Sequence, residues 1–295
     1  MFKFNFNVDS EEAEVLDDKK CVDQEPESAE SVECYDSEMI IVEEKHFENL
    51  DIYRATCTTA EYGDLEMSYL LAGCVGEILK DKGTDIKQAE EKHSDLIPGV
   101  YEGGAKIWEC TEDLLQYMAR NPESNIFQEK RILDMGCGAG LLGVYTLLKG
   151  GTVEFQDYNK DVLETITIPN VLLNLADSKE EIQSNLGRVS FYSGDWSKYA
   201  ELTKDDEKFD IILTSETIYN PNNYKKLADV FKRKLKKDGQ ILLAAKIYYF
   251  GVGGGLRTFE EYLANDKTFD SKSVSQSASD VHREILEIRF KENVQ

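Results

Sequence analysis

The sequence predicts an α/β fold, in which a doubly wound, mostly parallel sheet carries helices on both faces. Two observations lead to this prediction. Short apolar runs alternate with helical segments, and the first run ends in a glycine-rich turn. The last run alternates apolar with polar residues, which suits an antiparallel strand. The predicted strands are residues 131–135, 152–156, 188–193, 209–214, 240–246 and 285–290.

Charge sets the N-terminal part of the chain apart from the rest. Residues 1–50 hold 16 acids and 4 bases, so they carry −12 of the net charge of −23. Residues 1–38 are rich in Glu, Asp and Ser, which predicts an acidic tail without fixed structure. An acidic surface repels nucleic acid and attracts basic proteins, so we expect a basic protein partner and no direct nucleic-acid contact. A tail that is only solvated fits the composition equally well.

A small N-terminal element is expected at residues 39–93. Short β-type runs lie at residues 39–42 and 52–58, and residues 65–71 alternate in character. These runs favour a small β element, with a helix as the alternative. The main domain is then expected to cover residues 94–295.

A turn-rich stretch, residues 95–111, leads into the first predicted helix of the main domain. Thr111 is typical of an N-cap, and Asn121-Pro122 marks the expected end of the helix. Trp108 lies just before the helix start. Two interpretations of this tryptophan stay open, because it can pack the helix onto the sheet or form an aromatic wall of a cofactor site.

The glycine-rich turn is the strongest sign of a binding site. Asp134 stands two residues before the first of three glycines, Gly136, Gly138 and Gly140. Glycine permits a sharp turn with positive φ and lets a ligand approach backbone N–H groups at a helix start. The Gly-x-Gly-x-Gly spacing differs from the Gly-x-Gly-x-x-Gly of dinucleotide folds, and it favours S-adenosylmethionine.

Acidic residues follow the next two predicted strands. Asp157 comes directly after the second strand, 21 residues after Gly136 (157 − 136), where a carboxylate can bind both hydroxyls of a ribose. Asp195 and Trp196 follow the third strand. This pair can bond the amino group of an adenine and cover its face. The three residues therefore predict a nucleoside site.

The remaining elements complete the alternation of strands and helices. Pro169 interrupts a helical region at residues 162–175, where it suits the first turn of a second segment. A helix at residues 224–235 ends in a basic cluster, which we interpret as a solvated helix end rather than a nucleic-acid patch. A Lys-Asp-Gly turn then leads to the strand at residues 240–246. An aromatic and glycine-rich stretch, residues 248–255, precedes the last helix.

Composition argues against several classes of protein. The chain has no run of 18 apolar residues, and its N-terminus lacks the apolar stretch of a signal peptide. We therefore expect a soluble, intracellular protein without a membrane partner. The six cysteines form no Cys-x-x-Cys pair, which predicts reduced thiols and no metal site.

Taken together, these segments resemble the seven-strand S-adenosylmethionine-dependent methyltransferases, and more narrowly the eukaryotic histidine protein methyltransferases. The resemblance spans about residues 94–291. Its most specific strings are Ile-Trp-Glu-Cys-Thr at 107–111, Ser-Glu-Thr-Ile-Tyr-Asn at 215–220 and Phe-Gly-Val-Gly-Gly-Gly at 250–255. The resemblance implies a seven-stranded Rossmann-like methyltransferase sheet with a small N-terminal extension.

The resemblance also implies an activity and a cofactor site. The activity is transfer of a methyl group from S-adenosylmethionine to the tele nitrogen of one histidine in the large-subunit ribosomal protein L3, in the cytoplasm and nucleus. The implied positions and the glycine-rich turn together give the residues expected to bind the cofactor. They are Ile107, Trp108, Glu109, Cys110, Thr111, Asp134, Gly136, Gly138, Gln156, Asp157, Tyr158, Gly194, Asp195, Trp196 and Ser215.

Candidate catalytic residues follow the fourth strand, where a doubly wound sheet presents groups to a ligand. They are Glu216, Tyr219 and Asn220. Imidazole has an unperturbed pKa of about 6.5 and is a competent nucleophile when neutral, so the enzyme needs mainly to align one nitrogen and bond the other. An equal alternative is that Glu216 binds the ammonium group of the cofactor. Lysine methylation and a non-catalytic acidic module that binds a basic ribosomal protein are the other functions left open.

Overall fold

The structure is a computed structural model that describes residues 35–71, 86, 92, 96–97, 99–120, 126–176, 178–204, 207–277 and 281–292. Most of the predicted acidic tail therefore lies outside the described residues. Its last residues do not: the Tyr35 ring stacks on Tyr158 with centroids 5.0 Å apart, and Glu38 begins a strand. The boundary predicted at residue 38 thus falls inside an element of the main unit.

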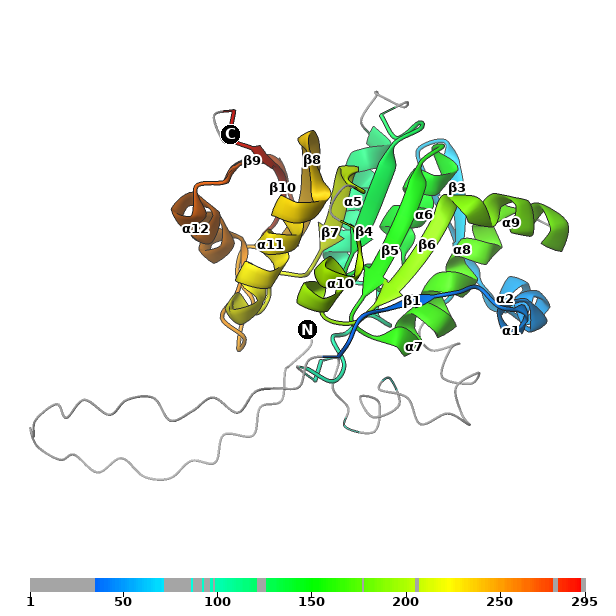
Figure 1. The fold of residues 1–295 in the computed structure, drawn as a ribbon. Helices are drawn as coiled ribbons and strands as arrows, with labels where there is room; N and C mark the ends of the chain where they lie inside the picture. The colour runs from blue at the N-terminus through cyan, green and yellow to red at the C-terminus, as the bar shows by residue number, and fades with distance from the viewer. Residues whose placement is uncertain are drawn as a thin grey trace, which may run out of the picture. The chain divides into compact units, whose positions relative to one another are not determined.

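An eight-stranded sheet forms the centre of the described part of the chain (Figure 1). Its strands are β1 (Glu38–Ile40), β4 (Arg131–Met135), β5 (Thr152–Asp157), β6 (Val189–Ser193), β7 (Phe209–Ser215), β8 (Leu235–Lys246), β9 (Phe269–Gln276) and β10 (Arg283–Phe290). The order across the sheet is β1-β6-β5-β4-β7-β8-β10-β9. The strands from β6 to β8 are parallel to one another, while β1, β10 and β9 are antiparallel to their neighbours. The predicted fold class is confirmed, and β1 adds an eighth strand from the N-terminal extension.

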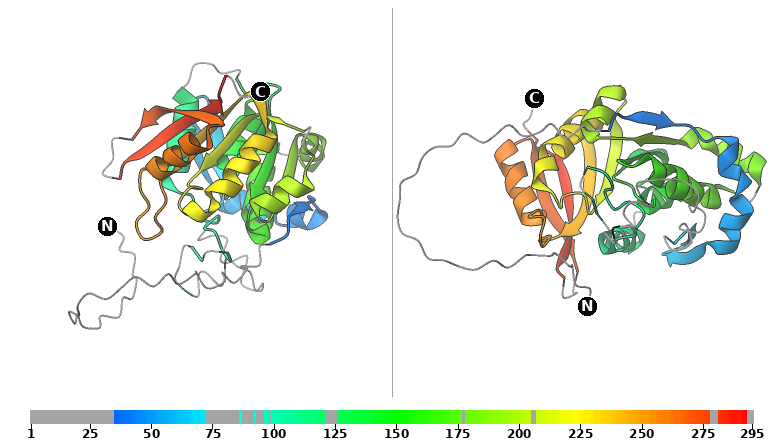
Figure 2. Two further views of the ribbon diagram at one scale, coloured as in Figure 1. Left: turned by 60° about the vertical axis from the view of Figure 1, so that its left-hand side comes forward. Right: turned by 90° about the horizontal axis from the view of Figure 1, so that it is seen from below.

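Both faces of the sheet are apolar. Successive residues of a strand point to opposite sides, so a continuous apolar run places apolar side chains on both faces. In β4, Ile132 belongs to the core on one face and Leu133 to the core on the other, and Leu213 and Ile212 of β7 divide in the same way. Helices cover each face (Figure 2). One layer holds α5 (Glu109–Arg120), α6 (Leu141–Leu148) and α8 (Ile168–Leu175), and the other holds α10 (Trp196–Leu202), α11 (Tyr224–Lys234) and α12 (Leu256–Asp266).

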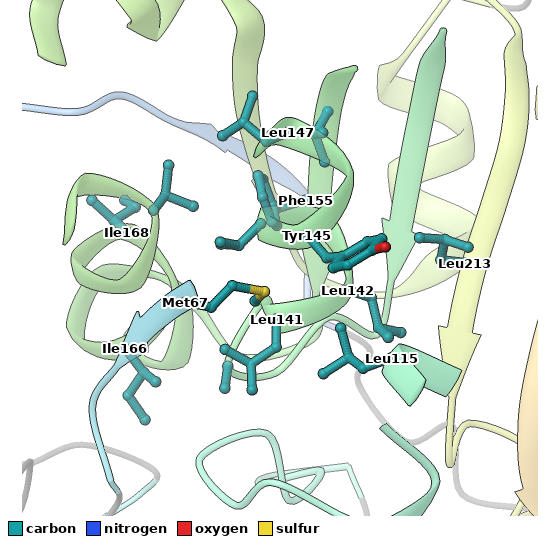
Figure 3. Packing of buried hydrophobic residues seen from close by; sticks show 14 of the residues in the cluster. Met67, Leu115, Leu141, Leu142, Tyr145, Leu147, Phe155, Ile166, Ile168 and Leu213 are labelled. Carbon is teal, nitrogen blue, oxygen red and sulfur yellow. The ribbon is translucent and has the colours of Figure 1, made fainter. Parts of the chain in front are cut away.

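Helix α6 is the buried centre of the first layer. A Cβ at Gly143 would lie 2.2 Å from the Phe155 ring, so glycine lets this helix pack directly on β5. Its side chains Leu141 and Tyr145 belong to the same buried cluster as Met67 (Figure 3). Because Met67 comes from the N-terminal part of the chain, that part shares the core of the main domain.

The N-terminal element is only partly the predicted β element. Residues 52–58 were expected to be a strand, but they belong largely to helix α2 (Leu50–Thr56), which follows α1 (Glu44–Glu48). Leu50 and Tyr53, three positions apart, are buried on one side of α2, so helical packing overrides the β-type composition. The next strands, β2 (Thr58–Tyr62) and β3 (Leu65–Tyr69), do form a hairpin.

Other local predictions need correction. Thr111 is not an N-cap, because α5 already begins at Glu109. β8 begins at Leu235, but its register against β7 shifts between Leu235 and Gln240, so the Lys-Asp-Gly stretch lies in an irregular part of the strand and regular pairing begins at Gln240, as predicted. Strand β9 was missed because its side chains are mostly polar. The remaining short elements are α7 (Lys160–Val162), the π-helix η1 (Leu163–Thr167), α9 (Lys179–Asn185), η2 (Leu186–Arg188) and η3 (Pro221–Asn223).

The basic cluster at the end of α11 is not uniformly solvated. Lys234 is completely buried, and its ammonium group donates to the carbonyl oxygens of Thr203 at 3.0 Å and Lys204 at 2.8 Å. Lys232 pairs with Asp266 at 2.6 Å. These lysines therefore tie α11 to neighbouring segments, which corrects the interpretation of a solvated helix end.

Within the described ranges, no helix is both long and apolar enough to cross a membrane. The same ranges hold no group of three or more His, Cys, Asp or Glu side chains placed to share a metal ion.

Candidate functional site

The carboxyl ends of β4, β5 and β7 define the candidate site. From β4 the chain moves outward in one direction to β5 and β6, and in the other direction to β7 and β8. The loops that follow the strands on either side of this switch point leave a crevice in which doubly wound sheets bind ligands. Three predicted groups of site residues occupy these loops: the glycine-rich turn, Gln156 to Tyr158, and Ser215 to Asn220.

Asp157 at the end of β5 is placed to hold a ribose. Its Oδ2 accepts the Gly138 amide at 2.8 Å and its Oδ1 accepts the Asn159 amide at 3.1 Å. Each carboxylate oxygen has a further acceptor position, which two vicinal hydroxyls can use. Burial raises the pKa of Asp157 to about 6, although the two amides act in the opposite direction.

A segment that we call the strap, residues 99–108, lies against Asp157 and the glycine-rich turn. A Cβ at Gly104 would lie 3.2 and 3.3 Å from the two carboxylate oxygens of Asp157, and a Cβ at Gly138 would lie 2.8 Å from the Gly104 carbonyl oxygen. Asn159 holds the strap by accepting the Glu102 amide at 3.0 Å and donating to the Val100 carbonyl at 2.6 Å. The strap therefore lies where it would form one wall of the predicted ribose site.

The predicted adenine end is built from Gln156 and the residues after β6. Gln156 donates to the Gly194 carbonyl at 2.8 Å and accepts the Trp196 indole N–H at 3.0 Å. Asp195 caps α10 by accepting the Ser197 amide at 2.9 Å, and its other oxygen accepts the Lys226 ammonium at 2.7 Å. Gln156 and Trp196 are thus brought together as expected, whereas both oxygens of Asp195 already have partners.

Asp134 lies behind the glycine-rich turn rather than in the crevice. The carboxyl is 1% exposed, and its Oδ2 accepts the Gly143 amide of α6 at 2.8 Å. Burial raises the pKa of Asp134 to about 8. The structure therefore gives Asp134 the position of a strand-to-helix tie, and a direct contact with cofactor stays a prediction. Gly136, with φ of 63°, is crowded by Thr217, since a Cβ there would lie 2.6 Å from its methyl group.

The start of α5 meets the end of β7 at the far side of the crevice. Thr111 Oγ1 lies 2.8 Å from Ser215 Oγ, so these two predicted residues are in contact. Cys110, which precedes Thr111, is buried, and burial raises the pKa of its thiol. The Trp108 indole N–H donates to the Gly103 carbonyl at 3.0 Å, which fixes the ring against the strap. Ile107 packs against the core, while the role of Trp108 as a wall of the cofactor site stays a prediction.

Glu216 is the most unusual residue of the site. It follows β7 directly, has a φ of 59°, and is buried. A non-glycine residue in the left-handed region is uncommon and costs of order 1–2 kcal/mol, and such strain concentrates at functional sites. Its Oε2 accepts the Tyr249 hydroxyl, and the Cys110 thiol also interacts with the carboxylate, whereas its enclosed Oε1 has no conventional hydrogen bond to any described residue.

Lys246 forms an ion pair with Glu216. Its ammonium lies 3.6 Å from Glu216 Oε1 and 3.2 Å from Glu109 Oε2, and it faces the Trp108 and Tyr249 rings at 5.3 and 5.7 Å from their centroids. Desolvation opposes the charged form, but the two carboxylates prevail and raise the pKa of Lys246. Burial, with Glu216 beside it, raises the pKa of Tyr249 well above its usual value. Tyr249 therefore remains a neutral hydrogen-bond donor.

The other two candidate catalytic residues differ in placement. The Tyr219 hydroxyl donates to Glu102 of the strap, and burial raises the pKa of that carboxyl. Asn220 caps η3 by accepting the Asn222 amide at 3.0 Å. Tyr219 thus joins the two sides of the crevice, while Asn220 terminates the loop.

Sequence reasoning missed four residues of this arrangement: Glu102, Asn159, Lys246 and Tyr249. Glu102, Asn159 and Tyr249 lie within residues 94–104, 155–159 and 249–255, which also carry the family resemblance, so a signal for them was available. Lys246 is recognised only through partners far along the chain.

Fold and residue placement together define a doubly wound α/β protein with a candidate nucleoside-cofactor site at the switch point of its sheet. A family model described as lysine methyltransferase matches residues 95–251. The chain is 42% identical over 227 residues to a histidine protein methyltransferase 1 homolog of Bos taurus, covering 70% of this chain and 60% of that one. A homolog of the same name from Dictyostelium discoideum is 46% identical over 203 residues, covering 68% and 62%. The histidine protein methyltransferase 1 of Schizosaccharomyces pombe is 31% identical over 230 residues, covering 65% and 66%.

The chain belongs to the lysine methyltransferase family defined by that model. The predicted resemblance to histidine protein methyltransferases is confirmed by relatives at about 40% identity. The chain spans about three fifths of the length of the first of these relatives, 60% and 62%.

Family membership implies S-adenosylmethionine as cofactor, as the Gly-x-Gly-x-Gly spacing predicted. The residues present fit this molecule. Asp157 offers a buried carboxylate where the ribose is expected, and Gly104 keeps the space above it free of a side chain.

Cofactor affinity is expected to fall at low pH. An ionised Asp157 accepts hydroxyl hydrogen bonds better than a protonated one, so affinity is nearly complete about one unit above the pKa, near pH 7, and declines as the pH falls through 6. Between pH 7.5 and pH 5.0 we expect the Kd for S-adenosylhomocysteine to rise roughly tenfold, which corresponds to one pH unit below the pKa. Calorimetry at several pH values measures this. Asp157→Asn should bind more weakly and show a flat profile, and an equally steep profile in that variant would assign the titration to another group.

Proposed function

We propose that this chain transfers a methyl group from S-adenosylmethionine to the tele nitrogen of a histidine in the large-subunit ribosomal protein L3, in the cytoplasm and nucleus. The relatives named histidine protein methyltransferase support the acceptor residue. The observation that carries the proposal is the buried carboxylate of Glu216, which directly follows the predicted cofactor residue Ser215 and whose Oε1 has an ion pair with Lys246 at 3.6 Å but no hydrogen bond to a described residue.

The chemistry of Glu216 favours imidazole over a lysine amine. A neutral imidazole carries one N–H and one lone pair, so a carboxylate that accepts the N–H aims the lone pair of the other nitrogen away from itself. Methylation makes the ring cationic, and the carboxylate stabilises that developing charge. A lysine must first lose a proton, and a nearby carboxylate favours its charged form, which is not a nucleophile.

Each side chain of the site then has a defined task. The cofactor supplies an electrophilic methyl group on a sulfonium. Glu216 orients the imidazole by its pros N–H, while Tyr249 and Lys246 fix the position and charge of that carboxylate. Tyr219 and Glu102 close the strap toward the loop after β7 and exclude water from the crevice. Orientation of this kind contributes more than proton transfer when the nucleophile is already neutral.

The test uses the full chain, recombinant L3 and deuterium-labelled S-adenosylmethionine. We expect label on one histidine peptide of L3, and an acid hydrolysate that coelutes with tele-methylhistidine. Label on lysine instead would favour the second candidate function, lysine methylation, which the description of the family model supports. Binding of L3 without label would favour a non-catalytic acidic binder.

A further inference from the structure

A cluster of exposed apolar side chains lies immediately after β8. Phe250 is 81% exposed, Tyr248 is 49% exposed and Val252 is 37% exposed. We call these three residues the aromatic tip. Single exposed apolar residues are common, but three within five positions form a patch of the kind that marks interaction sites.

The aromatic tip is held outward by an ordered turn. The Tyr249 amide donates to the Gly254 carbonyl at 2.9 Å, and the Gly253 amide donates back to the Tyr249 carbonyl at 3.2 Å. The rings of Tyr248 and Phe250 meet edge to face with centroids 5.1 Å apart. A fixed presentation of aromatic rings lowers the entropy lost on binding.

The same turn is joined directly to the candidate site. The Gly254 amide donates to the Tyr219 carbonyl at 2.9 Å, and a Cβ at Gly254 would lie 2.3 Å from the carbonyl oxygens of Ile218 and Tyr219. Tyr249 points inward to Glu216, while its neighbours Tyr248 and Phe250 are exposed. One side chain therefore separates the aromatic tip from the carboxylate expected to meet the acceptor.

We infer that the aromatic tip is the docking surface for the protein substrate, a basic polypeptide that packs an apolar side chain on Phe250 while its acceptor residue reaches Glu216. This inference rests on the proposed function. Charge supports a basic partner, because Glu102, Glu109 and Glu216 outnumber the one lysine, Lys246, that pairs with the last two, and the chain has a net charge of −23. Such charge speeds encounter, whereas a central aromatic residue supplies most of the binding energy.

The test compares Phe250→Ser with Ile52→Ser. Ile52 is 51% exposed on α2, which lies on the other side of the molecule from α12 (Figure 1), so it matches Phe250 in chemistry but not in location. For Phe250→Ser we expect the KM for recombinant L3 to rise roughly tenfold or more, as for loss of an interface anchor. The turnover number, the Kd for S-adenosylhomocysteine and the melting temperature should stay at wild-type values. Ile52→Ser should change none of them.

A direct binding measurement separates this inference from the proposed function. L3 is titrated into each protein saturated with S-adenosylhomocysteine. Weaker binding by Phe250→Ser alone supports the docking surface even if no histidine is methylated, in which case only the proposed function fails. Equal binding by wild type and Phe250→Ser overturns the docking surface while leaving histidine methylation in place. A wild-type protein that does not bind L3 contradicts both.

Discussion

Glu216→Gln is expected to lower the turnover number for methyl transfer roughly 10- to 100-fold, in the range seen when one preorganised electrostatic contact to a transition state is weakened. The amide still accepts the imidazole N–H, so substrate alignment survives in part. It carries no charge, however, and cannot stabilise the cation that forms on the ring. The Kd for S-adenosylhomocysteine is expected to change less than about twofold, because a contact to substrate alone contributes nothing to cofactor binding.

Tyr249→Phe provides the matched control for Glu216. It removes the hydroxyl that donates to Glu216 Oε2 but keeps the ring beside Lys246, so we expect a smaller loss of turnover, about threefold to tenfold, from a less well fixed carboxylate. The alternative role, in which Glu216 binds the ammonium group of the cofactor, gives the opposite result. In that case Glu216→Gln would weaken cofactor binding strongly, and turnover at saturating cofactor would be nearly normal.

The fold could be predicted because its signals are local. Central strands such as β4 and β7 are apolar on both faces, and each is followed by a helix, which indicates a parallel sheet buried between two layers. Strand β9 escaped detection because Asp270, Ser273 and Ser275 give it no apolar alternation. Helix α2 was mistaken for a strand because Ile52 and Tyr53 favour β structure, whereas burial of Leu50 and Tyr53 decides for a helix.

The candidate site was predictable where a residue follows its strand directly. Asp157 and Glu216, at the ends of β5 and β7, were each singled out in this way, and the structure places both at the carboxyl edge of the sheet. Interactions between segments that are distant in the sequence have no local sequence signal of this kind. The Tyr219 hydroxyl and Glu102 are 117 positions apart in the sequence, and Lys246 reaches Glu216 only because β8 lies beside β7. Pairing of this kind depends on the assembled sheet and strap.

Gly138→Ala is expected to weaken binding of S-adenosylhomocysteine about 100-fold. The new Cβ would lie 2.8 Å from the Gly104 carbonyl oxygen, a backbone atom of the strap that cannot rotate away. The φ of 50° adds strain of order 1 kcal/mol, and the overlap adds about 1–3 kcal/mol more. The backbone strain and the overlap both destabilise the conformation in which the Gly138 amide donates to Asp157 and the strap lies against the glycine-rich turn. Calorimetry measures the loss.

Two glycine variants separate the overlap from the backbone strain. Gly253→Ala imposes a similar positive φ, 82°, with no atom within 4 Å of the new Cβ. Gly187→Ala involves neither a positive φ nor an atom within 4 Å of the new Cβ. If the strap forms the wall of the site, both controls bind S-adenosylhomocysteine like wild type. At Gly136, by contrast, a new Cβ would first meet the Thr217 methyl group, at 2.6 Å, rather than the strap. Normal binding by Gly138→Ala would therefore mean that the strap leaves the glycine-rich turn when cofactor binds.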